Sequence, residues 1–270
     1  MSNSDHARLF PPLSLFRAVA FAYIEYEVVD PETSSEFYRN LLNISAAGAV
    51  GDTGAPFGFG HPRRRLLIRK GQTGASAPRV ASFGISVEGV EPEEIRAMLV
   101  AHGFDPLPGP LESWVVSDPF GFSVAVAAVQ QSEAVDAAPS GTFQASAFNH
   151  LAYHVDDYAV ARDFYLDVFG MRLAFEDGRK CSVAFGGPED AIYINRLSLP
   201  SKGSHVDHLA FSIPSFDLAQ VRRILVERGL NPEPDGNFAW TVRDPDGFRI
   251  QICAEIGVYP GAARDPFHEP

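Results

Sequence analysis

The strongest constraint on the fold is that the sequence repeats itself. Residues 90–122 align without a gap to residues 216–248, at an offset of 126. The identical pairs at this offset include Arg96 and Arg222, Leu99 and Leu225, Gly103 and Gly229, Trp114 and Trp240, Asp118 and Asp244, and Gly121 and Gly247. Upstream, Phe37 and Tyr38 match Phe164 and Tyr165 at an offset of 127. A repeat of this length in 270 residues predicts two domains of one fold.

Each half divides again into two units of one strand, one helix and three short strands. In the second half, the first unit combines an alternating strand at 148–155 with helical spacing over 157–169. The predicted elements that follow are strands at 171–176, 180–186, 191–197 and 206–213, a helix between an N-cap at Ser215 and a stop at Gly229, and strands at 238–243 and 247–254. We therefore predict an α+β fold of two tandem domains. Each would pair two β-α-β-β-β units in one curved, cupped mixed sheet.

The predicted domains span residues 1–128 and 147–270. The segment 129–146 between them is rich in Ala, Ser and Gln and has no strong period, so it reads as a linker. Earlier in the chain, the basic run HPRRRLLIRK at 61–70 is interpreted as a solvated face.

The overall charge narrows the class of partner. A net charge of −12 argues against nucleic acid or an anionic membrane and favours a small-molecule substrate. No stretch is long and apolar enough for a membrane-spanning helix. Cys181 and Cys253 lie in strand-like runs, as buried thiols do in a reducing cytoplasm, where we expect the protein to reside. A homodimer is the default expectation.

Two strands of the second half carry a histidine at matching points. The first reads NHLAYHVDD at 149–157 and the second HVDHLAFSI at 205–213, which places His150 and His208 before a Leu-Ala pair. The repeat offsets match these histidines to Tyr23 and Ser82 in the first half. Core packing in this fold therefore does not require histidine at these two positions. This favours a metal-binding role for the two histidines over a packing role.

Together these features resemble the vicinal oxygen chelate superfamily, which includes glyoxalase I, bleomycin-resistance proteins and the type I extradiol dioxygenases. The resemblance rests on paired β-α-β-β-β units, a histidine in the first strand of each unit, and the DPDGF turn before the last strand. Two tandem domains, with the histidines confined to the second, are most similar to the extradiol dioxygenases.

The resemblance implies a metal held by two histidines and a third ligand on the last strand. His150 and His208 match the first two positions, and Gln251 matches the third, where extradiol enzymes carry a glutamate. Glu255 is an alternative third ligand, four residues further along the strand. Iron(II) is the metal that the resemblance implies first, with manganese, nickel or zinc as alternatives.

The resemblance also raises candidates for proton transfer and substrate binding. Extradiol enzymes carry an acid/base histidine where this chain has a carboxylate, Glu189 or Asp190, and His154 shares a strand face with His150. These residues are therefore candidates for proton transfer. The residues expected to bind substrate are Tyr193, Phe238 and Thr241.

The first functional hypothesis is an iron(II)-dependent oxidoreductase. It would use O₂ to cleave, or otherwise oxidise, an aromatic or enolic small molecule that chelates through vicinal oxygens. One alternative is a metal-dependent lyase or isomerase of the glyoxalase type, for which the missing carboxylate matters less. The other is a metal-free binding protein of the bleomycin-resistance type.

Overall fold

The computed structural model describes residues 14–46, 55–60, 64–71, 79–129, 141–186, 190–198 and 203–255. The elements of the first half are β1 (Ala18–Val28), α1 (Pro31–Leu42), β2 (Ser45–Ala46), β3 (Ala55–Phe59), β4 (Arg64–Lys70), β5 (Arg79–Val87), α2 (Pro92–Ala101), β6 (Leu107–Pro108), a 3₁₀ turn (Pro110–Glu112), β7 (Trp114–Ser117) and β8 (Ser123–Ala128). Those of the second half are β9 (Ala147–Val155), α3 (Tyr158–Phe169), β10 (Arg172–Glu176), β11 (Lys180–Ala184), β12 (Ala191–Arg196), β13 (His205–Ile213), α4 (Leu218–Glu227), β14 (Glu233–Asp235), β15 (Ala239–Arg243) and β16 (Arg249–Ala254).

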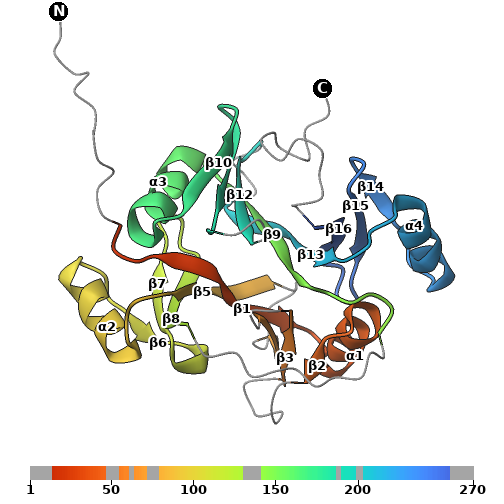
Figure 1. The fold of residues 1–270 in the computed structure, drawn as a ribbon, viewed down its shortest axis with the longest axis horizontal. Helices are drawn as coiled ribbons and strands as arrows, with labels where there is room; N and C mark the ends of the chain where they lie inside the picture. Colours follow the sequence, from red (N-terminus) through yellow and green to blue (C-terminus); the bar gives the residue numbers. More distant parts are fainter. Residues whose placement is uncertain are drawn as a thin grey trace, which may run out of the picture.

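The strands form two eight-stranded sheets with the same internal order (Figure 1). The first sheet runs β2-β3-β4-β1-β5-β8-β7-β6, and the second runs β10-β11-β12-β9-β13-β16-β15-β14. Each sheet joins two β-α-β-β-β units through an antiparallel pair at its centre, β1 with β5 and β9 with β13. The predicted α+β fold with two tandem cupped sheets is confirmed.

Helix α4 shows one wrong and one correct boundary prediction. Asp217, not Ser215, is the N-cap, and its side chain accepts a hydrogen bond of 2.7 Å from the backbone N–H of Gln220. Gly229 ends the helix with a φ of +76°, a conformation that glycine adopts without steric cost.

None of the helices in the described ranges is long and apolar enough to cross a membrane.

The two faces of the second sheet carry side chains of different size. On β9 and β13, the buried Leu151, Tyr153, Leu209 and Phe211 point into the main hydrophobic core. The opposite face, which we call the site face, carries the two histidines among a floor of small residues. These small residues are Ala152, Ala184, Ala191, Ala210, Ala239 and Cys253. Small side chains on this face leave room for a bound molecule.

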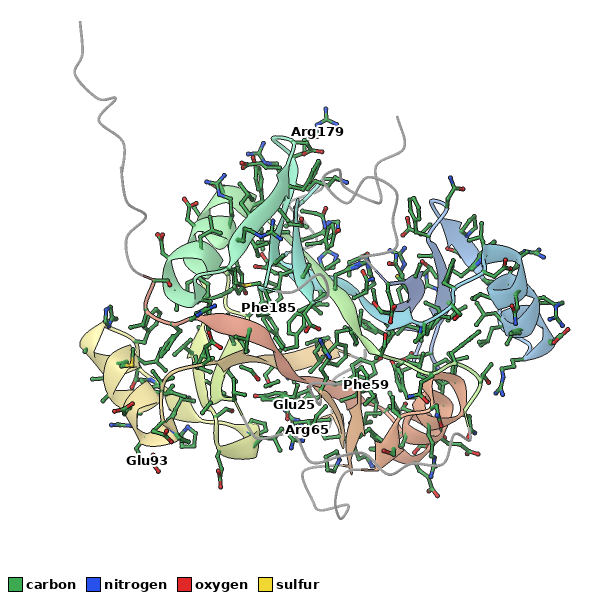
Figure 2. All side chains as sticks on the ribbon, in the orientation of Figure 1. Glu25, Phe59, Arg65, Glu93, Arg179 and Phe185 are labelled. Carbon is green, nitrogen blue, oxygen red and sulfur yellow. The ribbon has the colours of Figure 1, made fainter. Side chains whose placement is uncertain are left out.

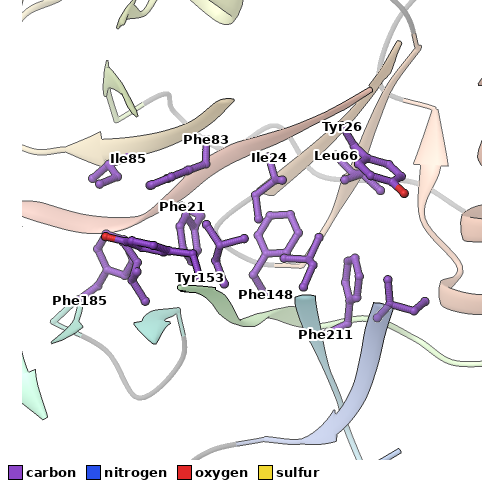
Figure 3. Close-up of a cluster of buried hydrophobic side chains, with 14 of the residues drawn as sticks. Phe21, Ile24, Tyr26, Leu66, Phe83, Ile85, Phe148, Tyr153, Phe185 and Phe211 are labelled. Carbon is purple, nitrogen blue, oxygen red and sulfur yellow. The ribbon is translucent and has the colours of Figure 1, made fainter. Parts of the chain in front are cut away.

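The core is continuous across both domains. Figure 3 shows aromatic side chains from both halves of the chain meeting in the core, and Figure 2 places Phe59 and Phe185 where the two halves meet. The ring of Phe21 lies 5.1 Å from that of Phe185, and the ring of Phe59 lies 4.8 Å from that of Phe148. The repeat offsets relate one pair to the other, so the domains meet around an approximate two-fold axis.

The aspartate of each Asp-Pro turn also joins the domains. Oδ1 of Asp244 accepts the backbone N–H groups of Asp246 and Phe248, which holds the turn together. Oδ2 accepts the hydroxyl groups of Tyr26 at 2.7 Å and Tyr38 at 2.9 Å, both from the first domain. The DPDG motif, expected only as a tight turn, therefore also fixes the relative position of the two domains.

Replacing Tyr38 with phenylalanine is expected to lower the free energy of unfolding by about 1.5–3 kcal/mol, because Asp244 then loses a buried charge-assisted hydrogen bond. Urea unfolding checks the value. The matched control is Tyr165→Phe, at the equivalent position of the second domain, where the bond to Asp118 is longer at 3.3 Å. Equal losses in the two variants, or none in Tyr38→Phe, would contradict this role.

Candidate metal centre

His150 on β9 and His208 on β13 face each other across the centre of the second sheet. Their Nε2 atoms lie 2.8 Å apart, and the two rings meet nearly at a right angle of 81°. His150 is 2% exposed, so the meeting point is inside the protein. The structure thus brings together the two histidines that the sequence predicts as ligands.

Each histidine directly follows the extra residue of a β-bulge. Between β9 and β13 the register shifts twice, which leaves Asn149 unpaired before His150 and Asp207 unpaired before His208. A bulge kinks the strand and re-aims the neighbouring side chains. These two bulges set the direction of both imidazole rings.

The first sheet has bulges at the matching points. There the extra residues are Ala22 before Tyr23 and Ala81 before Ser82. The hydroxyl groups of Tyr23 and Ser82 also approach each other, at 3.5 Å. Both sheets therefore direct this pair of positions toward a common point, but of the two sheets the second has imidazole nitrogens there and polar side chains in its bulges.

The bulge residues fix the protonation of both rings. Nδ1 of His208 lies 2.7 Å from Oδ2 of Asp207, and Nδ1 of His150 lies 2.8 Å from Oδ1 of Asn149. The amide nitrogen of Asn149 donates to Ser212 and Ala254, so its oxygen must be the atom that faces His150. Both partners are acceptors, and each Nδ1 therefore carries the proton.

With both Nδ1 atoms protonated, the two facing Nε2 atoms of neutral rings each present a lone pair. Two lone pairs at this distance repel unless a cation lies between them. Burial above all, and then the neighbouring His208, hold the pKa of His150 well below its usual range, so its Nε2 carries a lone pair that a cation can bind. Ligand bonds of 2.0–2.1 Å at a right angle separate two nitrogens by about 2.9 Å. The donor set therefore fits a divalent metal ion.

Gln251 occupies the next strand in the same row. It pairs with Ala210 of β13, which in turn pairs with His150 of β9, so all three side chains share the site face. The side-chain nitrogen of Gln251 donates to Asp235 on β14, and the Cys253 thiol lies 3.8 Å from its oxygen. Within the described ranges, no three His, Cys, Asp or Glu side chains are arranged to hold a metal. Among the described residues, a third protein ligand would therefore have to be a neutral one such as this amide.

Two other predicted residues are engaged elsewhere. The carboxylate of Glu255, beyond the end of β16, accepts a hydrogen bond of 2.9 Å from Ser146. Asp190 forms a buried ion pair with Arg64 of the first domain, with N–O distances of 2.8 and 2.5 Å. The proton-transfer role predicted for Asp190 therefore needs correction, since its carboxylate joins the two domains. Its alternative, Glu189, lies outside the described residues. Arg64, expected on a solvated face, is 5% exposed.

Of the remaining predicted residues, Tyr193 and Thr241 lie close to the three candidate ligands, and His154 and Phe238 lie further away. The ring of Tyr193 lies 4.5 Å from that of His150, and Thr241 pairs directly with Gln251. His154 is further along β9, where it stacks on His205 at 5.2 Å. Phe238 lies in the turn between β14 and β15 and is partly exposed.

The sequence-based reasoning missed the partners that hold the ligands. Asn149 and Asp207 bind the two imidazoles, and Asp235 binds Gln251. Arg249 adds a contact of 2.8 Å to Asp207. One signal was available, because an Asn or Asp directly precedes each histidine, whereas alanine occupies both equivalent positions of the first half.

Comparison with known proteins supports the same family. No curated protein matches the sequence significantly. Among solved structures, the 2,3-dioxygenase LapB from Pseudomonas sp. KL28 is 17% identical, with a TM-score of 0.71 over 94% of this chain and 97% of that one. The Mn(II)-bound glyoxalase from Novosphingobium aromaticivorans is 18% identical, with a TM-score of 0.70 over 89% and 83%. Homoprotocatechuate 2,3-dioxygenase from Brevibacterium fuscum, in a variant form, is 17% identical, with a TM-score of 0.68 over 93% and 76%.

A family model matches the part of the chain that contains the histidine pair. Its description is the Glyoxalase/Bleomycin resistance protein/Dioxygenase superfamily, and the match covers residues 147–252. The resemblance to the vicinal oxygen chelate superfamily is thus confirmed. Residues 147–252 match the model of this superfamily, and the chain shares its fold with catechol-type dioxygenases and with a glyoxalase.

Proposed function

We propose that this protein is a divalent-metal-dependent enzyme acting on a small molecule that chelates through two neighbouring oxygens. The observation that carries the proposal is the pair of facing Nε2 atoms with both Nδ1 protons held by acceptors. His150 and His208 would hold the metal, with Gln251 as the third ligand. Iron(II), with O₂ as co-substrate in the extradiol manner, is the first candidate, because catechol-type dioxygenases are among the proteins that share the fold.

The residues around the histidine pair have separate tasks. When bound, the metal would polarise two substrate oxygens and stabilise the charge left as they lose protons. The ring of Tyr193, packed against His150, would form one wall for a planar substrate. The hydroxyl group of Thr241 is buried without a hydrogen-bond partner among the described residues, so it can bind a polar atom of the substrate.

His154 is the remaining candidate for proton transfer. Burial lowers its pKa, as does the neighbouring His205, while Asp207 acts in the opposite direction. The ring is therefore neutral near pH 7 and can accept a proton. It lies four residues from His150, about 13 Å along the strand, so it would serve the outer end of a bound substrate.

A cleft beside Gln251 provides space for that outer end. Its volume is about 300 Å³, and its lining includes Asn231, Thr241, Arg243 and Arg249. The lining also includes Glu233, but its two arginines outnumber this carboxylate. On a protein of strongly negative net charge, they favour a substrate with an acidic or electron-rich group.

A second candidate function follows from the neutral character of Gln251. Without a carboxylate ligand, a bound ion keeps its full charge, which favours Lewis-acid chemistry of the glyoxalase type over electron transfer to O₂. The similarity to a manganese-bound glyoxalase is consistent with this alternative.

Anaerobic loading of the purified protein with iron(II), followed by addition of O₂ and a panel of catechols, separates the two candidates. Oxygen uptake with a ring-cleaved product supports the dioxygenase. Turnover of an enolisable substrate without oxygen uptake supports the lyase or isomerase. His150→Ala is expected to abolish either activity, and wild-type protein that binds no divalent metal would leave the metal-free binding protein as the function.

A further inference from the structure

We infer that Asp235 is a positioning residue that orients Gln251 and supplies the negative charge that this neutral ligand lacks. The inference rests on the proposed metal site. Asp235 lies on β14, two strands away from β16, which carries Gln251.

The first argument is geometric. The side-chain nitrogen of Gln251 donates to Oδ2 of Asp235, and a carboxylate can only accept. This contact fixes which end of the amide is nitrogen and leaves the oxygen as the end that can bind a metal. His150 and His208 are held in the same manner, by Asn149 and Asp207. All three proposed ligands therefore have their donor group bound to an acceptor, and such outer partners orient ligands and raise their basicity.

The second argument is charge. Two neutral imidazoles and one amide leave a divalent ion with its full charge inside the protein, which is costly. Asp207 shares its charge with Arg249 at 2.8 Å. Within the described ranges, no ion pair involves Asp235, so its charge remains to act through Gln251. The pair Gln251–Asp235 thus stands in for the carboxylate ligand of extradiol enzymes.

The third argument comes from the first half of the chain. At the offset of 126, Gln251 corresponds to Ala125 and Asp235 to Gly109. Both members of the pair are absent from the half in which Tyr23 and Ser82 replace the histidines. The aspartate, the glutamine and the histidines therefore occur together, as expected if they serve one site.

The test is the affinity of the metal-free protein for Mn²⁺, measured by calorimetric titration. Asp235→Ala is expected to weaken binding by about 10–100-fold, the usual effect of losing an outer partner. Asp235→Asn retains an acceptor for the amide but removes the charge, so it is expected to fall between wild type and Asp235→Ala. The control is Glu227→Gln, which removes an exposed charge at the end of α4 and should bind Mn²⁺ as wild type does.

A double variant separates the charge effect from a general structural effect. Gln251→Glu alone places two carboxylates in contact, which opposes the gain from a charged ligand. Adding Asp235→Asn turns that contact into a hydrogen bond to the new ligand, so Gln251→Glu/Asp235→Asn should bind Mn²⁺ at least as tightly as wild type. Asp235→Asn alone is expected to weaken Mn²⁺ binding. If the same substitution restores binding in the Gln251→Glu background, damage to the fold cannot be the cause. Thermal unfolding of each metal-free variant serves as the folding control.

The outcomes distinguish this inference from the proposed function. Wild-type protein that binds no Mn²⁺ overturns the metal site itself and this inference with it. Wild-type binding that Asp235→Ala leaves unchanged overturns only the role of Asp235. Additive effects of Gln251→Glu and Asp235→Asn, with no rescue, would show that the two residues do not act together.

Discussion

Replacing His208 with alanine is expected to weaken Mn²⁺ binding by more than 100-fold. Loss of an outer partner of a metal ligand typically costs about 10–100-fold, and removal of one of two converging imidazoles should cost more. The remaining His150 cannot hold an ion together with a neutral amide at comparable affinity. Calorimetric titration of the metal-free protein gives the value.

The same variant gives a second readout through stability. A ligand at 100 times its dissociation constant stabilises the folded state by about 2.7 kcal/mol, so Mn²⁺ should raise the unfolding temperature of wild type but not of His208→Ala. His102→Ala, which removes an exposed histidine at the end of α2, is the control and should behave as wild type. Equal Mn²⁺ affinity in wild type and His208→Ala would contradict the assignment of the ligands.

The second large effect is expected at Asp190. Asp190→Ala should lower the free energy of unfolding by about 3–5 kcal/mol, because it leaves the guanidinium of Arg64 buried without its partner. The side chains of Asp190 and Arg64 are 2% and 6% exposed, so water cannot replace the lost contact. Urea unfolding measures the loss, and the Mn²⁺ affinity of the folded variant should match that of wild type.

A charge exchange provides the control for this ion pair. Arg64 and Asp190 occupy equivalent positions of the two halves, at the offset of 126, so Arg64→Asp/Asp190→Arg places the same two groups across the same approximate axis. The double variant should recover part of the stability lost in Asp190→Ala. Loss of activity in Asp190→Ala without loss of stability would instead return Asp190 to its predicted proton-transfer role.

The fold was largely predictable because its determinants are local and repeated. Strand alternation and helical spacing gave the elements of the second half to within a few residues, except for β14 at Glu233–Asp235, for which no bounds were predicted. The offset of 126 indicated that the first half has the same order. The N-cap of α4 was misplaced because Ser215 and Asp217 are both good capping residues. Only the structure shows that Asp217 accepts the Gln220 N–H, while Ser215 adopts a φ of +56°.

The sequence indicated the facing histidine pair but not the residues that hold it. His150 and His208 stand out because the first half has other residues at the same positions. Asn149 and Asp207 did not stand out, since a bulge adds one residue without a clear break in the apolar pattern. Asp235 and the Arg64–Asp190 ion pair depend on contacts between strands or domains far apart in sequence, which a local pattern does not contain.

The most direct test of this account is a crystal structure of the protein grown with Mn²⁺, with the anomalous scattering of the metal recorded. We predict one strong peak between His150 and His208, bonded to both Nε2 atoms, with the side-chain oxygen of Gln251 as the third protein ligand. A peak elsewhere, or two imidazoles turned away from each other with no ion between them, would contradict the central claim.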